Sequence, residues 1–330
     1  PPSEGGLPRR YSGNAMRMLG DDKAGYEAIL AEIERAEESI YLCTYILGHD
    51  DDAPARAVME ALTRRAREGV EVLVLIDALG SFFAGKRMLR AFREAGGRVA
   101  RFAPVLPLQT RTSANLRNHR KALIIDARRV ITGGQNIECR FIGKEHDPKR
   151  YRDFSVIIEG PAVAGFMRSF VSDWCFAAGD EPDVFRQYLS TIPEPAGEED
   201  MEVITSGPDV VGDPLWEEIV ALLQDAAESI TIATPYFIPD EVVFRSLLVK
   251  ARMGRQVRII IPKQSDSKLV DYARGPYLRE LHQAGADIRL YKPGMMHGKI
   301  ITTDDKTGVL GSANLDMRSM FVNFECAVFV

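Results

Sequence analysis

Two nine-residue segments of the chain carry the same ionisable residue types at the same spacing. The segments are NHRKALIID (118–126) and MHGKIITTD (296–304). Their shared pattern, His-x-Lys-x-x-x-x-Asp, comprises His119, Lys121 and Asp126 and, in the second copy, His297, Lys299 and Asp304. If each segment is a strand, its His and Lys point to the same face, because side chains alternate along a strand. The pattern therefore sets an imidazole beside an ammonium group twice.

Two imidazoles and two ammonium groups that converge on one cleft would form a strong anion site, with a phosphate as its natural occupant. Glycine-rich segments, GGQN and GSAN, follow the two motifs. They offer backbone N–H groups and the side chains of Asn136, Ser312 and Asn314 as further hydrogen-bond donors. Donors of this kind stabilise charge on a transferring phosphoryl group. We therefore interpret the repeated motif as two halves of one phosphoryl-transfer site.

The paired histidines also indicate covalent catalysis. One imidazole would attack phosphorus, while the other would protonate the leaving alcohol and then deprotonate the incoming one. A carboxylate on the opposite ring nitrogen would fix the tautomer that the nucleophile needs. Asp153 and Glu325 are candidates for this carboxylate, because each lies near the start of a strand just downstream of its motif.

The remaining motif residues and the acidic runs have simpler interpretations. We expect Asp126 and Asp304 to hold local turns or strand ends rather than to do chemistry. A lone His-x-Lys on a strand is usually a partly exposed edge, but two copies with glycine-rich turns favour a site. The run HDDD (49–52) is typical of a solvated loop, because consecutive aspartates rarely converge on one ion. We therefore expect neither a metal nor a cofactor.

Five landmarks recur in the same order in the two parts of the chain, which is the signature of an internal repeat. AEESIYLCTYIL pairs with AAESITIATPYFI, RAREGVEVLVLID with KARMGRQVRIIIP, FREAGGRVARF with LHQAGADIRLY, VITGGQNI with GVLGSANL, and the two motifs with each other. Strands that alternate with helices predict an α/β fold. We expect two similar α/β/α halves with mixed, mostly parallel sheets, related by a pseudo-twofold axis with a shared central cleft.

The segment STIPEPAGEED (190–200) is rich in proline and acidic residues and is predicted to be a linker. We accordingly assign residues 1–195 to the first half and residues 196–330 to the second. Residues 24–38 and 216–228 show the apolar spacing of helices. The short runs SIYLCTYI, VEVLVLID, SITIATPYF and VRIIIP, rich in β-branched residues, are typical of buried parallel strands.

Composition limits the possible partners. The 330 residues carry a net charge of −5, which disfavours nucleic acid because phosphate backbones select basic faces. No apolar run reaches the roughly 18 residues of a membrane span. The chain begins at Pro1 without a methionine, so we expect it to be a piece of a longer protein. The motifs are flanked by FAPVLPL (102–108) and PGMM (293–296), apolar segments with two open interpretations: ordinary loop packing, or apolar surface for a lipid at the cleft mouth.

Together, these motifs resemble the phospholipase D superfamily, whose signature is the duplicated His-x-Lys-x4-Asp pattern. The likeness is closest to bacterial cardiolipin synthases and covers roughly residues 24–329, in NHRKALIID, TGGQNI, YRDF, TPYFIPD, IIIPKQSD, MHGK and GSANLDMRSMFVNFE. The resemblance implies a phosphohistidine formed without a metal, with His119 as the nucleophile and His297 as the general acid. Three features depart from the pattern. Tyr151 replaces a more usual tryptophan. Gly134 occupies the position that Ser312 has in the second repeat, so the first half lacks one hydroxyl donor. The chain stops at Val330 where the family continues with a helix.

The function implied by the resemblance is phosphatidyl transfer. One phosphatidylglycerol would give its phosphatidyl group to His119, and a second would accept it to form cardiolipin. Hydrolysis of phospholipid head groups is the main alternative. A phosphodiesterase or nuclease is disfavoured by the acidic balance, and a lipid-binding pseudoenzyme by the intact histidines and lysines.

The expected partners are a phospholipid substrate and a membrane surface. The expected location is the bacterial inner (cytoplasmic) membrane, bound peripherally or through a segment outside this chain. The acceptor alcohol, the head-group preference and the oligomeric state stay open.

Overall fold

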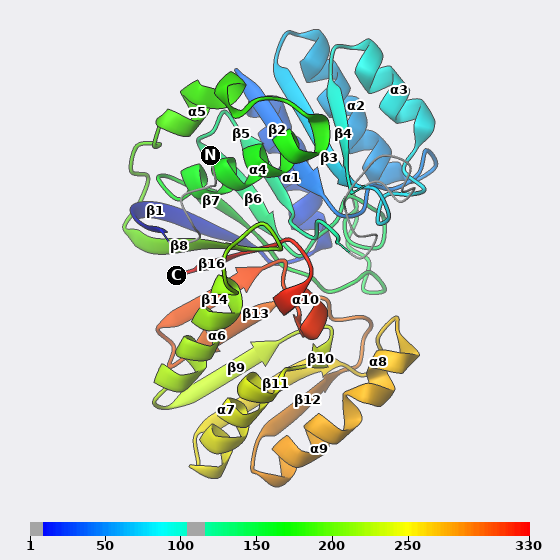
Figure 1. Ribbon diagram of the computed structural model, residues 1–330. Helices are drawn as coiled ribbons and strands as arrows, with labels where there is room; N and C mark the ends of the chain where they lie inside the picture. The colour runs from blue at the N-terminus through cyan, green and yellow to red at the C-terminus, as the bar shows by residue number, and fades with distance from the viewer. Residues whose placement is uncertain (1–8, 104–115) are drawn as a thin grey trace.

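The computed structural model describes residues 9–103 and 116–330 (Figure 1). The first part of the described chain forms β1 (Arg9–Leu19), α1 (Asp22–Arg35), β2 (Ser39–Thr44), α2 (Ala53–Arg67), β3 (Glu71–Asp77), α3 (Lys86–Glu94), β4 (Arg98–Phe102), β5 (Ala122–Ile125), β6 (Arg129–Gly133), β7 (Ser155–Glu159), α4 (Val163–Ala178), a 3₁₀ turn (Pro182–Phe185) and α5 (Arg186–Ser190). The second part forms β8 (Glu199–Ser206), α6 (Pro214–Asp225), β9 (Ser229–Ala233), β10 (Phe237–Ile238), α7 (Glu241–Arg252), β11 (Gln256–Pro262), α8 (Lys268–Ala273), α9 (Gly275–Gln283), β12 (Asp287–Tyr291), β13 (Ile300–Thr303), β14 (Thr307–Gly311), β15 (Leu315–Asp316), α10 (Met317–Phe321) and β16 (Glu325–Phe329).

One continuous sheet runs through both parts of the molecule (Figure 1). Across the described residues it has 14 strands, in the order β12-β11-β9-β13-β14-β16-β8-β1-β7-β6-β5-β2-β3-β4. The two parts meet where β1 pairs antiparallel with β8. Outward from this pair, the repeated segments of the sequence occupy matching positions on the two sides. The two parts are therefore similar in strand order, whereas the pseudo-twofold axis and the division at residue 195 stay predictions.

The α/β class is as predicted, but the expectation of mostly parallel sheets is wrong. Strands run parallel only near the two ends of the sheet, from β2 through β3 to β4 and from β9 through β11 to β12. The middle of the sheet is antiparallel, from β2 through β5, β6, β7, β1, β8, β16, β14 and β13 to β9. Helices connect the parallel neighbours β2, β3 and β4 and the parallel neighbours β9, β11 and β12, whereas the tight β5–β6 and β13–β14 turns impose antiparallel pairing.

Strand β2 of the first part is buried on both faces. All six residues of β2 are buried, as the run of β-branched and apolar residues predicts. Ile40 and Leu42 belong to the core that α1 and α2 cover, while Tyr41 and Cys43 belong to the core on the α4 side. Side chains of one strand thus fill two cores, because successive residues point to opposite faces.

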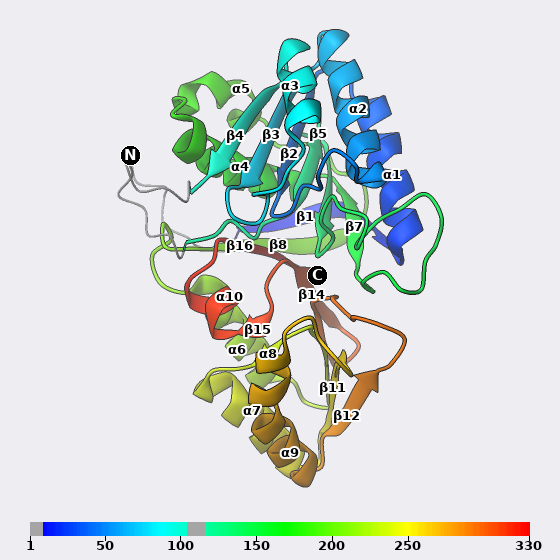
Figure 2. The same cartoon turned by 90° about the vertical axis from the view of Figure 1, so that its right-hand side faces the viewer.

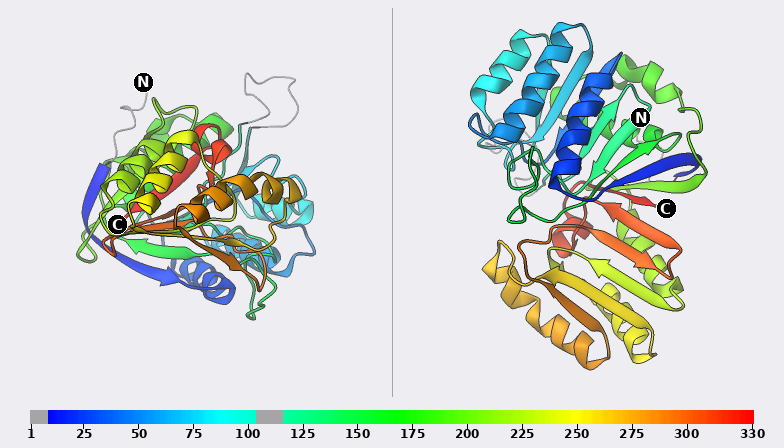
Figure 3. Two further views of the ribbon diagram at one scale, coloured as in Figure 1. Left: turned by 90° about the horizontal axis from the view of Figure 1, so that it is seen from below. Right: turned by 180° about the vertical axis from the view of Figure 1, so that it is seen from behind.

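The second part departs from the expected α/β/α layering. Its core packs α6, α7 and α9 against one face of the sheet. The other face carries exposed polar residues, including Arg258, which pairs with Asp287 at 2.9 Å. Seen from behind in Figure 3, the strands of this part face the viewer. Helices therefore cover both sheet faces in the first part and one face in the second, within the residues that the structure describes.

The motif aspartates lie at the far ends of their strands, in the β5–β6 and β13–β14 turns. Asp126 and Asp304 have positive φ angles of 51° and 55°, and the residue after each is also left-handed, as in the tight turns of hairpins. The Asp126 carboxylate accepts hydrogen bonds from the backbone N–H groups of residues 37–39, and Asp304 accepts from those of residues 227–229. Each aspartate therefore connects a hairpin turn to the start of the neighbouring strand, β2 or β9.

Two further expectations concern the linker at residues 190–200 and the lack of an apolar run long enough to span a membrane. Residues 191–198 form neither helix nor strand, and β8 begins at Glu199. Among the described residues, no helix has the length and apolar character needed to cross a bilayer.

The turn around Asp304 should make stability depend on pH. Its three backbone hydrogen bonds lower the pKa of the carboxyl group from 3.8 to about 2. A carboxyl group whose pKa is lower in the folded state stabilises above its unfolded pKa, and this contribution disappears as pH falls through the folded pKa. We expect Asp304→Asn to lower the melting temperature at pH 7, with a difference from wild type that shrinks between about pH 4 and pH 2.

The neighbouring change Asp305→Asn, in the same turn, is the matched control and should follow wild type. A melting-temperature difference for Asp304→Asn that stays constant across this pH range would contradict the assignment.

Candidate active site

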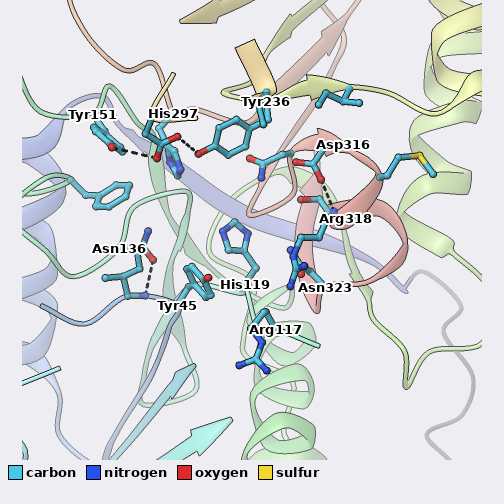
Figure 4. Close-up of a pocket in the computed structure, with 18 of the residues that line it drawn as sticks. Tyr45, Arg117, His119, Asn136, Tyr151, Tyr236, His297, Asp316, Arg318 and Asn323 are labelled. Atoms are coloured by element: carbon cyan, nitrogen blue, oxygen red, sulfur yellow. Dashed lines mark hydrogen bonds between the residues drawn. The ribbon is translucent and has the colours of Figure 1, made fainter. Parts of the chain in front are cut away.

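Both motif histidines line one cavity of about 490 Å³ whose walls come from both parts of the chain (Figure 4). His119 lies three residues before β5, and His297 lies three residues before β13. The predicted strands are thus shorter than expected, since both histidines and both lysines precede them. The expected convergence of the two imidazoles on one cavity is present.

Each motif is held by backbone pairing with the other part of the chain. The N–H of His119 donates to the carbonyl of Phe324 at 2.9 Å, directly before β16. The N–H of His297 donates to the carbonyl of Arg152 at 2.7 Å, shortly before β7. Glu325 directly follows Phe324, and Asp153 directly follows Arg152, so each carbonyl precedes one of the two predicted acids. The pairing therefore brings each imidazole to the carboxylate of the opposite half.

The first such pair is His119 with Glu325. Nδ1 of His119 lies 3.1 Å from both carboxylate oxygens of Glu325 and 3.0 Å from the carbonyl oxygen of Ser312. Burial would raise the pKa of Glu325, but His119, Lys121 and the Ser312 hydroxyl together lower it. An ionised carboxylate accepts a hydrogen bond from the Nδ1–H group, which keeps the proton on Nδ1 and leaves Nε2 bare. Burial also lowers the pKa of His119, so the neutral imidazole is suited to nucleophilic attack through Nε2.

The second pair is His297 with Asp153, joined by a 2.5 Å contact between Nδ1 and Oδ2. Burial and the nearby Lys299 lower the pKa of His297 to about 4, although Asp153 opposes this shift. Burial would raise the pKa of Asp153, but Lys299 and His297 lower it below its usual value. Aromatic rings surround this imidazole, with the ring centroids of Phe141 and Tyr151 at 5.1 Å and 5.7 Å.

The two motif lysines are buried beside the histidines rather than on the cavity wall. Lys121 Nζ donates to the carbonyl of His119 at 2.5 Å, and Lys299 Nζ lies 2.8 Å from Nδ1 of His297. Burial lowers the pKa of Lys121 to about 7 and that of Lys299 to about 8. The positive charge of each lysine also lowers the pKa of His297. A bound anion would raise all these pKa values, because an opposite charge favours the protonated form.

The departure at Gly134 has a steric explanation. A Cβ on Gly134 would lie 2.2 Å from Oδ1 of Asp153, so any side chain would displace that carboxylate. At the corresponding position of the second repeat, the Ser312 hydroxyl donates to Oε2 of Glu325. Ser312 was predicted to face the phosphate, but it is buried and does not line the cavity. It instead holds the carboxylate that contacts His119.

Two predicted amides do line the cavity. Asn136 Oδ1 accepts from the backbone N–H of Ile46 at 3.1 Å, a contact drawn in Figure 4. The Asn314 side-chain oxygen is buried and has no hydrogen-bond partner among the described residues. Asp126 and Asp304 lie outside the cavity lining, at the opposite ends of strands β5 and β13.

Several lining residues were not predicted from the sequence. They are Tyr45, Arg117, Arg140, Phe141, Tyr151, Tyr236, Asp266, Asp316 and Arg318. Tyr45 and Tyr236 carried a usable signal, because both follow a threonine at or just after the end of a repeated strand, as TY and TPY. The carboxyl ends of parallel strands are where side chains of α/β sites gather. Asp266 lies in the loop after β11 and ends the segment IIIPKQSD that carries part of the family resemblance, but nothing in that segment assigned it a role in the site.

Within residues 9–103 and 116–330, no three His, Cys, Asp or Glu side chains are placed to share a metal ion. The PGMM segment, expected to give apolar surface at the mouth, is different in the structure, because Met295 and Met296 are buried. Most of the other apolar segment, residues 102–108, lies outside the described residues.

Comparison with known proteins identifies similar sequences and folds. A family model described as "Cardiolipin synthase, PLD-like domain" matches residues 29–174 and 219–330. The chain is 36% identical over 318 residues to a cardiolipin synthase of Geobacillus kaustophilus, covering 95% of this chain and 62% of that protein. It is 35% identical over 316 residues to a cardiolipin synthase of Alkalihalophilus pseudofirmus, with the same two coverages. The chain thus spans somewhat less than two thirds of these relatives.

Among solved structures, the fold is similar to that of the phosphatidylserine synthase of Haemophilus influenzae. The TM-score is 0.75 at 16% identity, covering 98% of this chain and 84% of the other. A polyphosphate kinase from Porphyromonas gingivalis gives a TM-score of 0.60 at 15% identity, covering 96% of this chain and 44% of that one. At these identities the similarity concerns the fold.

The effect of Lys299 on the pKa of His297 can be tested by substitution. Because burial and Lys299 both lower the pKa of this imidazole, Lys299→Met should raise it from about 4 toward its ordinary value of 6.5. Histidine-selective ¹⁵N NMR against pH would measure the shift. Lys306→Met, a change in the β13–β14 turn, is the control and should leave the His297 titration in place. An unchanged pKa in Lys299→Met would show that the ammonium does not act on the ring.

Proposed function

Since this chain belongs to the family of PLD-like domains of cardiolipin synthases, we propose that it transfers a phosphatidyl group from one phosphatidylglycerol to another and so makes cardiolipin. The observation that carries the proposal is the pair of imidazoles in one cavity, each with a buried carboxylate at Nδ1. The cardiolipin synthases of Geobacillus and Alkalihalophilus support the choice of substrate.

In the first step, Nε2 of His119 attacks phosphorus. The bond from phosphorus to the head-group oxygen breaks, and protonated His297 gives its proton to the departing glycerol. The low pKa of His297 is compatible with this role, because a bound phosphodiester anion would raise it. Glu325 stabilises the positive charge that develops on the attacked ring, in the manner of a catalytic triad.

In the second step, His297 takes a proton from a hydroxyl group of a second phosphatidylglycerol. That oxygen attacks the phosphohistidine, the P–N bond breaks, and His119 returns to its starting state. Lys121, Lys299, Asn136 and Asn314 would stabilise the charge on the transferring group. Ser312 acts through Glu325 and Gly134 leaves room for Asp153, so both are positioning residues.

Two acid–base pairs arranged in this way predict distinct defects for the two histidines. His119→Ala should form no covalent adduct with a p-nitrophenyl phosphodiester. His297→Ala should retain part of the first step, because p-nitrophenolate leaves without an acid, and should accumulate phosphohistidine since the second step lacks its base. Mass spectrometry of peptides prepared without acid would locate the adduct on His119. His282→Ala, an exposed histidine outside the cavity, is the control.

Lipid product analysis separates transfer from hydrolysis with the same proteins. Wild type and the His282→Ala control should convert phosphatidylglycerol into cardiolipin and glycerol in equal amounts. An adduct on His297 in the His119 variant would reverse the assignment of roles. Phosphatidic acid as the main wild-type product would contradict transfer and favour hydrolysis.

An apolar rim around the cavity mouth supports a membrane surface as the second partner. We define the apolar rim as six exposed side chains: Leu79, Phe82, Phe83, Leu269, Tyr272 and Met317. The rim comes from three segments, which are the loop between β3 and α3, helix α8 and helix α10. Each of them reaches the cavity. Gly80 packs against Tyr45 of the lining, Val270 of α8 is in the lining, and Met317 is itself a lining residue. Helices α8 and α10 both face the viewer in Figure 2.

Basic residues accompany the rim, as expected for contact with anionic lipid. Lys86 and Arg87 directly follow its first segment, and Lys268 begins α8; all three are exposed. Apolar side chains flanked by lysine and arginine are typical of segments that insert into an anionic lipid interface. We therefore propose that the protein binds the bacterial inner membrane with the apolar rim against the lipid, so that head groups reach the cavity from the bilayer.

The apolar rim gives a direct binding test. Phe82 and Phe83 are 61% and 81% exposed, so each has much apolar area to transfer into lipid. The double change Phe82→Ser/Phe83→Ser should weaken binding to phosphatidylglycerol vesicles at least about tenfold, as the burial energy of phenylalanine implies. Flotation assays would measure it. The control is Met253→Ser, a residue outside the rim that caps the C-terminal end of α7 and is similarly exposed at 62%. Equal binding by the rim variant and this control would refute the role of the rim.

A further inference from the structure

One group of polar side chains in the cavity takes no part in the chemistry proposed above. The Tyr236 hydroxyl donates to Oδ1 of Asp266 at 2.6 Å, and the Tyr151 hydroxyl donates to Oδ2 at 3.5 Å (Figure 4). All three residues line the cavity. The contact draws together both parts of the chain, because Tyr151 precedes β7 whereas Tyr236 and Asp266 follow β9 and β11.

This group lies on the His297 side of the cavity. The Tyr151 ring is 5.7 Å from the His297 ring, centroid to centroid. Tyr151 is also only two residues from Asp153, which contacts Nδ1 of the same imidazole. A proton donor and acceptor for an alcohol must lie within hydrogen-bond reach of its oxygen. The alcohol that His297 serves therefore occupies the space next to Tyr151, Tyr236 and Asp266.

Asp266 supplies what a hydroxyl-rich alcohol needs there. Much of the surrounding wall consists of hydrogen-bond donors, including Arg117, Arg140 and Arg318, and a further hydroxyl on the alcohol needs an acceptor. An ionised carboxylate offers about four acceptor positions, and the two tyrosines use two of them. The other lining carboxylate, Asp316, is already engaged as the N-cap of α10, where it accepts from the N–H of Ser319 at 2.8 Å.

We propose that Asp266, oriented by Tyr151 and Tyr236, determines acceptor specificity by accepting a hydrogen bond from the second hydroxyl of a polyhydroxy alcohol. The proposal rests on the proposed transfer reaction and adds the identity of the acceptor class. An alcohol with a neighbouring hydroxyl, such as a glycerol head group, places one oxygen at His297 and the other at Asp266. A monohydric alcohol leaves the carboxylate unused, so it gains nothing from this contact.

A cationic head group is the competing ligand for a carboxylate, and the surrounding charges disfavour it. The Arg140 guanidinium carbon lies 5.8 Å from the Tyr151 ring centroid, on the ring that contacts Asp266. Arg117, Arg318 and the two buried lysines add positive charge around the same cavity. An ammonium group would therefore meet repulsion beside its one partner, whereas a neutral hydroxyl would not.

The test is a competition between acceptors. The purified protein receives a phosphatidyl donor with a p-nitrophenyl leaving group, together with glycerol, 1-propanol and ethanolamine, and the phosphatidyl products are quantified. Asp266→Asn should lower the glycerol-to-propanol product ratio at least about tenfold, the size expected for a hydrogen bond to a charged group. Tyr236→Phe, which removes one hydroxyl that orients Asp266, should lower the ratio in the same direction by raising the KM for glycerol. Asp225→Asn, at the end of α6, is the matched control and should keep the wild-type ratio.

The outcomes separate the proposal from the reaction on which it rests. Release of p-nitrophenol by wild type without transfer to any alcohol would refute the transfer reaction itself. Transfer with an unchanged glycerol-to-propanol ratio in both Asp266→Asn and Tyr236→Phe would overturn the role of Asp266. A selective loss of the ethanolamine product in Asp266→Asn would assign the site to a cationic head group and overturn the proposal in favour of that ligand.

Discussion

The cavity depends on the crosswise pairing of each motif with the opposite half of the chain. Without the backbone contacts of His119 with Phe324 and of His297 with Arg152, neither imidazole would reach its carboxylate. Arg120, between His119 and Lys121, points away from the cavity and secures the same arrangement. Its guanidinium binds Asp173 of α4 at 2.6 Å and donates to the carbonyls of Glu325 and Ser206. A buried ion pair of this kind is costly to break, because one charge would be left unpaired. The two halves are thus joined at the residues that flank the chemistry.

Burial in this junction also sets the electrostatics of the site. Two lysines and two histidines share a small region with Asp153 and Glu325, and burial is the largest cause of the lowered pKa values of Lys121, Lys299 and His297. An anion bound in the cavity would favour the charged forms of these buried groups, so the site is suited to a negatively charged ligand. Preorganised charge in a water-poor site stabilises a phosphoryl transition state without reorganisation. In this account the same cations hold the substrate phosphate, stabilise the transition state and tune His297 as acid and base.

The sequence predicted which side chains meet in the cavity better than it predicted the arrangement of the strands. The duplicated motif pointed to His119 and His297, because its residue types and spacing are preserved in both repeats, and the two acids were candidates because each lies near the start of a strand downstream of its motif. It did not reveal that the acids pair crosswise, since this depends on strand order. The central strands β1 and β8 were missed because RRYSGNAMRML and EDMEVITS lack the apolar runs of buried strands. The parallel pairing of the outer strands was extended wrongly to the whole sheet. Ser312 and Asp266 show the same limit, because a side chain's partner is set by tertiary contacts that its own segment does not contain.

The central claim is that phosphorus passes through His119 in two displacements, and the stereochemical course at phosphorus tests it most directly. Each in-line displacement inverts configuration, so two in succession restore it. A phosphatidyl donor made chiral at phosphorus with oxygen isotopes and sulfur would be transferred to an alcohol, and the product configuration would be read by ³¹P NMR. The account predicts retention of configuration. Inversion would require direct attack by the acceptor on the donor lipid and would contradict a covalent intermediate on either histidine.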